Sequence, residues 1–303
     1  TLQDVRDGKA TLEKFVAQLS IEEMAIIIRG EGMSNPRVTR GTASAFGGMS
    51  DSLFNYGIPA ACCADGPSGL RMEGKATQLP IGTALSATWN TELVRELYTM
   101  EGQELYRNQV DTLLGPGVNI RRNPLNGRNF EYYSEDPLLA GNLAAAVSKG
   151  VQSKAGCGVT IKHFACNNQE DNRMGVDVHL SERTLREIYC RGFEIAVKES
   201  KPAAIMSSYN LVNGIHAANS KDLCTTIVRN EWGFDGVIMS DWNTTVPEDG
   251  SIPWKCAAAG NDIIMPGNEN DHRNILEAYR SGKLSEEEIR MCARRILQLI
   301  EKL

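Results

Sequence analysis

Several features of metal, membrane and nucleic-acid proteins are missing from this 303-residue chain. None of its eight cysteines forms a C-x-x-C pair, which argues against a zinc ribbon or a thioredoxin-like site. No apolar run approaches the roughly 20 residues that a membrane helix needs. Long basic runs are also missing, and 32 Lys and Arg against 38 Asp and Glu give a net charge of −6. We therefore expect no membrane and no nucleic acid among the partners.

The composition that remains is that of an ordinary globular protein, with 42% apolar and 23% charged residues. A chain of this length can bury a sizeable core without the help of disulfides or a metal. We expect the cysteines to be reduced and buried, as in a cytoplasmic protein. No signal peptide is recognisable, but the start at Thr1 instead of Met leaves secretion as an alternative.

Short apolar runs alternate with amphipathic stretches from about residue 59 onward. The runs are continuous in apolar character, which is typical of parallel strands covered on both faces. Each is followed by Gly, Pro, Asn or Asp, the residues that favour turns. The predicted strands are 60–64, 110–114, 158–164, 203–207, 236–239 and 262–265, with a weaker candidate at 79–85.

Helical patterns fill the gaps between these strands. They cover 91–107, a stretch that begins at Asp136-Pro137, 181–198, and a last stretch from Ser285, where Glu288 completes a capping box. Ser20 and Glu23 make a similar box. Repeated β-then-α units predict an α/β fold that resembles the (β/α)8 TIM barrel, incomplete or irregular in this chain. We expect one domain over 1–303, with 1–58 as a helical and loop lead-in packed on the barrel.

Chemically active side chains follow the predicted strands. In parallel α/β folds the carboxyl ends of the strands meet at one edge, where sites are built. Each residue also has a structural explanation: Asp241 as a helix cap, Arg128 in a surface pair with Glu131 or Asp136, Trp242 as core. The convergence of several strand ends favours a site. These ends supply Asp65, Arg128, Lys162, His163, Tyr209, Asp241 and Trp242.

Carboxylates, cations, amides and aromatic rings at one mouth suit a hydroxyl-rich ligand. Glycoside hydrolysis uses two carboxyl groups, a nucleophile or base and an acid. Asp241 is the best candidate nucleophile because it ends a strand beside Trp242, and a nearby Arg or Lys would keep it ionised. Lys162 and His163 are neighbours and would point in opposite directions on a regular strand.

Two other enzyme classes compete with this interpretation. An aldolase would use Lys162 as a Schiff-base nucleophile, but it leaves the Asn-Asn-Gln-Glu and Ser-Asp-Trp segments unexplained. A metal-dependent hydrolase has little to build on, because the chain has four histidines and no His-x-His pair. The histidines are His163, His179, His216 and His272.

Four segments carry a resemblance to a known family. Residues 114–137, 161–170, 206–210 and 236–242 closely resemble β-glucosidases of glycoside hydrolase family 3, and the match runs from about Leu19 to the C-terminus. The resemblance implies the family's (β/α)8-like domain. It also implies retaining cleavage of terminal nonreducing β-D-glucosyl residues through a covalent glycosyl-aspartate, with neither a metal nor an organic cofactor.

The resemblance also implies a role for individual residues. Asp241 matches the nucleophile, and Asp65 matches the aspartate that binds distal hydroxyls of the nonreducing sugar. Other matches are to glycone contacts or to residues that line the same subsite. The glycone contacts are Arg71, Arg128, Lys162, His163, Arg173 and Tyr209, and the lining residues are Met206 and Trp242.

One departure from the family concerns the acid/base. In the β-glucosidases a Glu of a second, α/β sandwich domain performs this role, and we find no such domain in the chain. Glu170, Glu182 and Glu248 do not match it, and the catalytic His of the family's N-acetylglucosaminidases is also missing. We therefore expect a fragment or one part of a larger enzyme, whose partner domain or chain supplies the acid. The alternative is a glycan-binding barrel that has no acid.

Overall fold

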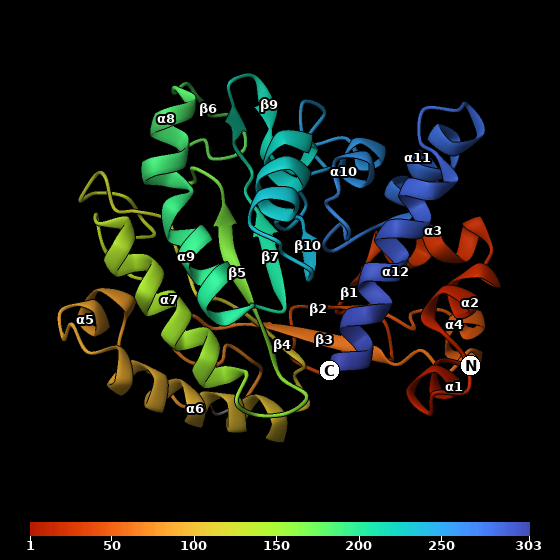
Figure 1. Cartoon of the computed structure of the whole chain (residues 1–303), viewed down its shortest axis with the longest axis horizontal. Coiled ribbons are helices and arrows are strands. Elements are labelled where there is room, and N and C mark those ends of the chain that lie inside the picture. The colour runs from red at the N-terminus through yellow and green to blue at the C-terminus, as the bar shows by residue number, and fades with distance from the viewer. Residues whose placement is uncertain (75) are drawn as a thin grey trace.

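The computed structural model describes residues 1–74 and 76–303 as an α/β fold around one main sheet (Figure 1). The sheet has seven strands in the order β1-β2-β3-β4-β5-β7-β10. The strands from β3 to β10 run parallel, whereas β1 and β2 join antiparallel at one edge. Their bounds are β1 Glu31–Gly32, β2 Ser44–Gly47, β3 Ala60–Asp65, β4 Thr112–Leu114, β5 Gly158–Phe164, β7 Ala204–Ser207 and β10 Val237–Met239.

The sheet curls into an incomplete TIM-like barrel. The predicted strand 262–265 forms only one bridge, between Met239 and Ile263. The backbone N–H of Ile264 donates to the carbonyl of Ile28 at 2.9 Å. This segment therefore spans the gap between β10 and the residues before β1 through isolated hydrogen bonds. It does so without forming a regular strand.

Uninterrupted runs of apolar residues in the sequence explain why several strands were predicted correctly. All seven residues of β5 are buried, as expected of a central parallel strand with both faces covered. Besides the segment 262–265, two further expectations differ from the structure. The weak strand candidate 79–85 overlaps the short helix α5 Gly82–Ser86, and the lead-in 1–58 contributes strands β1 and β2 as well as helices.

Local capping chemistry fixes several helices where the sequence places them. Asn90 caps α6, and Asp136 caps α7 with Pro137 at its first position. The boxes at Ser20 and Ser285 start α3 and α12. The predicted helix 181–198 forms as α8, a π-helical turn and α9. Besides α5, the α-helices are α1 Leu2–Arg6, α2 Leu12–Ala17, α3 Ile21–Arg29, α4 Asp51–Asn55, α6 Thr91–Arg107, α7 Pro137–Val151, α8 Glu182–Thr184, α9 Arg191–Ser200, α10 Pro253–Ala259, α11 Glu269–Arg280 and α12 Glu286–Lys302, and a π-helix covers Asp222–Glu231.

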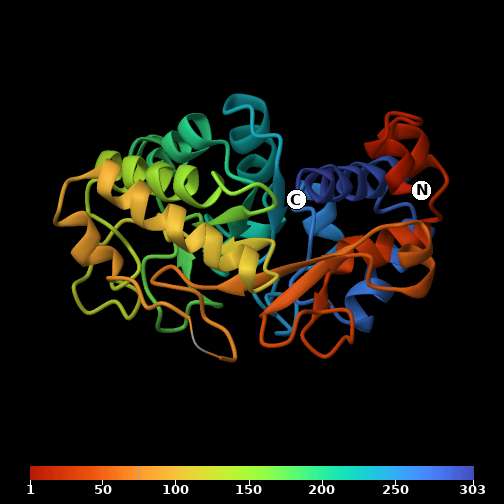
Figure 2. The same cartoon turned by 90° about the horizontal axis from the view of Figure 1, so that it is seen from below.

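Two large apolar cores lie between these helices and the sheet, beside a third, small cluster around Val38 and Met49. One contains buried side chains of α6, α7 and α9, and the other those of α3 and α12. Figures 1 and 2 show the red N-terminal helices beside the blue α12 at one end of the molecule, with α6 and α7 at the other. Arg290 connects α12 to the N-terminal helix α2, because its Nη1 donates to the carbonyl of Val16 at 3.1 Å.

The eight cysteines are buried and carry free thiols. They lie in both cores and in β3. Among the helices of the described residues, none is both long and apolar enough to cross a bilayer. A second, small sheet of β6 Asp177–Val178, β8 Leu211–Val212 and β9 Ile215–His216 flanks the carboxyl end of the barrel.

Candidate active site

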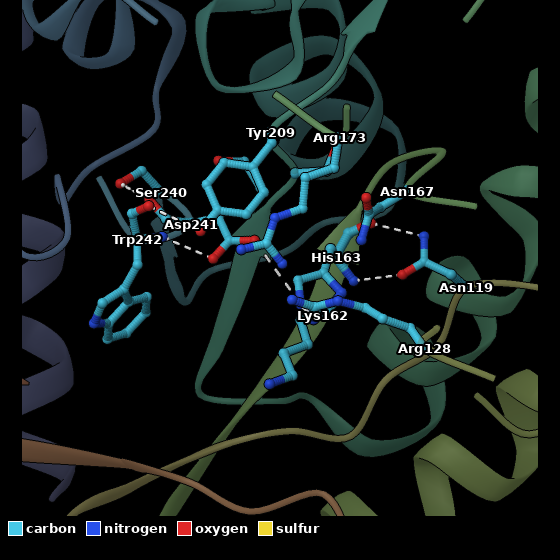
Figure 3. Close-up of polar contacts among 12 residues, drawn as sticks. Asn119, Arg128, Lys162, His163, Asn167, Arg173, Tyr209, Ser240, Asp241 and Trp242 are labelled. Carbon is cyan, nitrogen blue, oxygen red and sulfur yellow. Dashed lines mark hydrogen bonds and ion pairs between the residues drawn. The ribbon is translucent and has the colours of Figure 1, made fainter. Parts of the chain in front are cut away.

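A cavity of about 1020 Å³ opens at the carboxyl ends of the parallel strands. The strand-end residues singled out in the sequence meet there (Figure 3). Arg173 does not line the cavity itself, but it lies over the ring of Tyr209, which does. The remaining predicted site residues line it directly: Asp65, Arg71, Arg128, Lys162, His163, Met206, Tyr209, Asp241 and Trp242.

Asp241 follows β10 and is 5% exposed. Its Oδ1 accepts the backbone N–H of Trp242 at 2.7 Å, whereas its Oδ2 has no hydrogen-bond partner among the described residues. Oδ2 lies 3.9 Å from Nε2 of His163. The next helix, α10, begins only at Pro253. Asp241 is therefore not the cap of that helix, and one of its carboxylate oxygens is not held by a hydrogen bond from the described residues.

Burial raises the pKa of Asp241, and nearby positive charge opposes the shift only in part. Arg128, the N–H of Trp242, Lys162 and Arg173 all favour the ionised form, in that order. The net shift is nevertheless upward. Removal from water therefore outweighs the cations in setting the direction of the shift, while the predicted effect of the nearby Arg and Lys side chains, which is to favour the ionised form, is present.

Arg128 contacts three other side chains that line the cavity. Its Nε donates to Oε2 of Glu170 at 2.9 Å, and its Nη1 donates to Oε1 of Glu131 at 2.9 Å. The same Nη1 lies 2.6 Å from Nε2 of His163. The predicted pair with Glu131 does form, but it lies inside the site and not on the surface, because Glu131 is only 3% exposed. Arg128 is thus held rigidly by charged partners.

Lys162 and Asp65 form a second ion pair, next to the pair of Arg128 and Glu131. Nζ of Lys162 donates to Oδ1 of Asp65 at 2.7 Å and lies 3.8 Å from Oε2 of Glu131. Burial acts to raise the pKa of Asp65, but Lys162 and then Arg71 outweigh it and lower the pKa. Burial acts to lower the pKa of Lys162, but Asp65 and Glu131 raise it, so the amine is held in its charged form.

Lys162 and His163 both line the cavity, although neighbours on a regular strand point to opposite faces. The register between β5 and β7 is irregular here, with a shift between Ile161 and Phe164. Such an irregularity redirects side chains at the end of a strand. It is a feature that the apolar pattern of the sequence does not reveal.

An aromatic group lies next to the free oxygen of Asp241. The hydroxyl of Tyr209 donates to the carbonyl of Trp242 at 2.8 Å. The guanidinium of Arg173 lies 4.6 Å from the centroid of the Tyr209 ring, and Arg173 also donates to Glu170. The indole of Trp242 lines the cavity on the side of Asp241 away from Arg128 (Figure 3). An apolar ring face there can cover one side of a sugar.

Some residues of the site were not among the predicted site residues. Glu131 was considered only as a surface partner of Arg128, and Glu170 only as a candidate acid. Tyr132 and Asn119 contact His163 through Nδ1 and through its backbone, and both are buried. Glu131 and Tyr132 lie in the segment 114–137 that carries the family resemblance, which was the available signal.

Comparison with known proteins decides the family. The sequence profile described as "Glycosyl hydrolase family 3 N terminal domain" matches residues 6–299. The chain belongs to glycosyl hydrolase family 3. A β-glucosidase of Ruminococcus albus is 49% identical over 308 residues, which cover 99% of this chain and 32% of that protein. An exo-α-(1→6)-L-arabinopyranosidase of Bifidobacterium longum is 42% identical over 259 residues, covering 81% and 33%.

Solved structures of the family share the fold. A β-glucosidase from Paenibacillus barengoltzii superposes with a TM-score of 0.93 at 52% identity, covering 100% of this chain and 34% of that one. β-Glucosidase 3B from Thermotoga neapolitana, solved in complex with α-D-glucose, gives a TM-score of 0.89 at 42% identity, covering 96% and 42%. The family 3 chain described here spans about a third of the length of the curated relatives it matches.

Proposed function

We propose that this family 3 chain binds the terminal nonreducing β-D-glucosyl unit of a glycoside and attacks it with Asp241 in a retaining hydrolysis. The observation that carries the proposal is the unpartnered Oδ2 of Asp241, a residue that lines the large cavity. A carboxylate oxygen with no donor keeps its lone pair available. Nearby Arg128, Lys162 and Arg173 favour the ionised form, which is the nucleophilic form.

The first chemical step conserves atoms and charge in a simple way. Oδ2 of Asp241 donates an electron pair to the anomeric carbon as the bond from that carbon to the aglycone oxygen breaks. The aglycone leaves with the bonding pair and takes up a proton from a general acid. In the second step the conjugate base of that acid takes a proton from water, and the water oxygen bonds to the anomeric carbon on the side that the aglycone left. The bond to Oδ2 breaks and releases Asp241 as a carboxylate, so that two inversions give net retention.

Ion pairing of the other carboxylates supports an acid from outside this set of residues. A general acid must carry a proton before it acts. Asp65 accepts a hydrogen bond from Lys162, Glu131 from Arg128, and Glu170 from Arg128 and Arg173. Each acts as an acceptor toward a cation, as an ionised carboxylate does. We therefore propose that a further domain or a partner chain supplies the acid/base.

We assign recognition of the glycone, the sugar unit that is cleaved off, to the charged side chains that line the cavity. Lys162 with Asp65 and Arg128 with Glu131 offer paired donors and acceptors that a sugar hydroxyl can join without leaving a buried charge unpaired. Trp242 provides the apolar face. The relatives at 42% identity named as arabinopyranosidases make an L-arabinopyranosyl unit the second candidate glycone.

Mass spectrometry with an activated 2-deoxy-2-fluoro-β-D-glucoside tests the nucleophile. The reagent carries a dinitrophenyl leaving group, which departs without the help of a general acid. The 303-residue chain should therefore gain one fluoroglucosyl group on the peptide that contains Asp241. Asp241→Asn is the matched control and should gain none. No adduct on a folded chain, or an adduct on another residue, would contradict the proposal.

Two substrate comparisons test the remaining assignments. The chain should react with aryl β-D-glucosides and leave cellobiose intact, because general-acid catalysis is worth about 10²–10⁴-fold and matters most for a poor leaving group. Rapid cleavage of cellobiose by the chain alone would contradict an external acid. A higher kcat/KM for an aryl α-L-arabinopyranoside than for the aryl glucoside would show that L-arabinopyranose is the preferred glycone. It would not affect the role proposed for Asp241.

A further inference from the structure

His163 lies between two hydrogen-bonding groups that fix where its proton is. Nη1 of Arg128 lies 2.6 Å from Nε2, and the hydroxyl of Tyr132 lies 3.0 Å from Nδ1 (Figure 3 shows Arg128 beside the ring). A guanidinium donates hydrogen bonds and cannot accept them. Nε2 must therefore be the acceptor, without a hydrogen of its own. A neutral imidazole then carries its proton on Nδ1.

The neutral state of the ring has an independent cause. Burial, and then the positive charges of Arg128, Lys162 and Arg173, hold the pKa of His163 well below its usual value. The ring is 1% exposed. A second proton is therefore not available near neutral pH, and the choice lies between the two neutral tautomers.

The hydroxyl of Tyr132 can accept a hydrogen bond from Nδ1–H of His163, because its two other hydrogen bonds leave one lone pair free. Its hydroxyl donates to the carbonyl of Asn167 at 3.2 Å and accepts from Nδ2 of the same residue at 3.1 Å. One lone pair remains for the N–H of His163. The Tyr132 side chain is fully buried and does not line the cavity, so no substrate contact competes for this hydroxyl.

We infer that Tyr132 is a positioning residue that, together with Arg128, holds His163 in the Nδ1–H tautomer and so keeps the nucleophilic oxygen of Asp241 free of a donor. Oδ2 of Asp241 is 3.9 Å from Nε2. In the other tautomer that nitrogen would carry a hydrogen, lose the hydrogen bond from Arg128, and become able to donate to Oδ2 once the ring rotates. A hydrogen-bonded carboxylate is a poorer nucleophile. The consequence for turnover rests on the proposed function, whereas the tautomer itself does not.

Nitrogen-15 NMR of the histidine rings reads the tautomer directly. The chain has four histidines, so selective labelling gives few signals, and His163→Gln assigns the one of interest. Wild-type His163 should show the Nδ1–H pattern. Tyr132→Phe removes the acceptor of this proton and should shift the signals toward Nε2–H. An Nε2–H or doubly protonated ring in the wild type would overturn the inference, with no variant needed.

Tyr133→Phe is the matched control, because Tyr133 is the adjacent residue and is equally buried. The rate of fluoroglucosyl transfer to Asp241 should fall about tenfold in Tyr132→Phe, since a buried donor loses its partner. It should change by less than about twofold in Tyr133→Phe. Equal rates in the two variants, or no spectral change in Tyr132→Phe, would refute the assignment. A wild-type chain that forms no adduct but shows Nδ1–H would contradict the proposed function alone.

Discussion

Glu131 offers the sharpest test of how the site is held together. It is 3% exposed, and its carboxylate lies 2.9 Å from Nη1 of Arg128 and 3.8 Å from Nζ of Lys162. Glu131→Gln keeps the shape and one carbonyl acceptor but removes the charge. Two buried cations then share their remaining partners, Asp65 and Glu170. We expect the variant to be less stable and slower.

The distances set the scale of the effect. At an effective dielectric constant of about 20, the two contacts represent gross attractions of about 6 and about 4 kcal/mol. Desolvation of the buried carboxylate cancels much of this sum, and breaking such a pair by removing one partner costs about 3–5 kcal/mol. The amide of Glu131→Gln can still accept a hydrogen bond from Arg128, so we expect the free energy of unfolding to fall by about 2–4 kcal/mol. At about 2 °C per kcal/mol for a chain of this size, the melting temperature should fall by about 4–8 °C.

Thermal unfolding at pH 7, followed by circular dichroism, measures the shift. Glu182→Gln is the control, because Glu182 pairs with Arg186 at 2.9 Å on the surface and its side chain is 77% exposed. Exposed pairs contribute at most about 1 kcal/mol, so this variant should melt within about 2 °C of the wild type. Equal melting temperatures for the two variants would show that Glu131 does not hold the buried cations.

Further predictions concern Asp241 and Lys162. Asp241→Asn should lower hydrolysis by at least about 10⁴-fold. It should also raise the melting temperature at pH 7, because a raised folded pKa means that the ionised carboxylate opposes folding, and the gain should vanish as pH falls toward 3.8. Adduct formation by the wild type should increase with pH, with a midpoint above 3.8; a midpoint at or below that value would contradict the burial effect. Borohydride with a carbonyl compound should leave Lys162 unmodified, since its amine is held charged, and a reduced adduct found there by peptide mapping would favour the aldolase.

The fold was predictable wherever burial on both faces produces a continuous apolar run. Strands β3, β5 and β7 follow this rule, and the capped helices α6 and α12 follow from local chemistry. Strand β1 is only two residues long and β2 four, and neither carries enough pattern to be seen. The run at 79–85 is apolar because α5 packs on the core, and a short buried helix and a short buried strand have the same composition.

The position of a candidate site residue was predictable where it lies at or just after the end of a strand. Asp65, Lys162 and Asp241 were predicted in this way to lie together, and they line one cavity, because topology alone brings strand ends together. Glu131 and Tyr132 lie on the long connection between β4 and α7, whose path depends on the ion pairs and hydrogen bonds that it forms inside the cavity. No periodicity encodes that path, so these residues acquire a role only once the coordinates are known.

Burial of the eight thiols gives this protein an internal reporter of its own opening. Burial raises the pKa of Cys166 and of Cys224 to about 12, so the reactive thiolate is scarce while the chain is folded. A thiol reagent at neutral pH can then label a cysteine only during a fluctuation that exposes it. Cys63 reports on β3, Cys166 on the end of β5, and Cys292 on α12. Labelling rates would therefore rank the local stabilities of the two cores without any engineered probe.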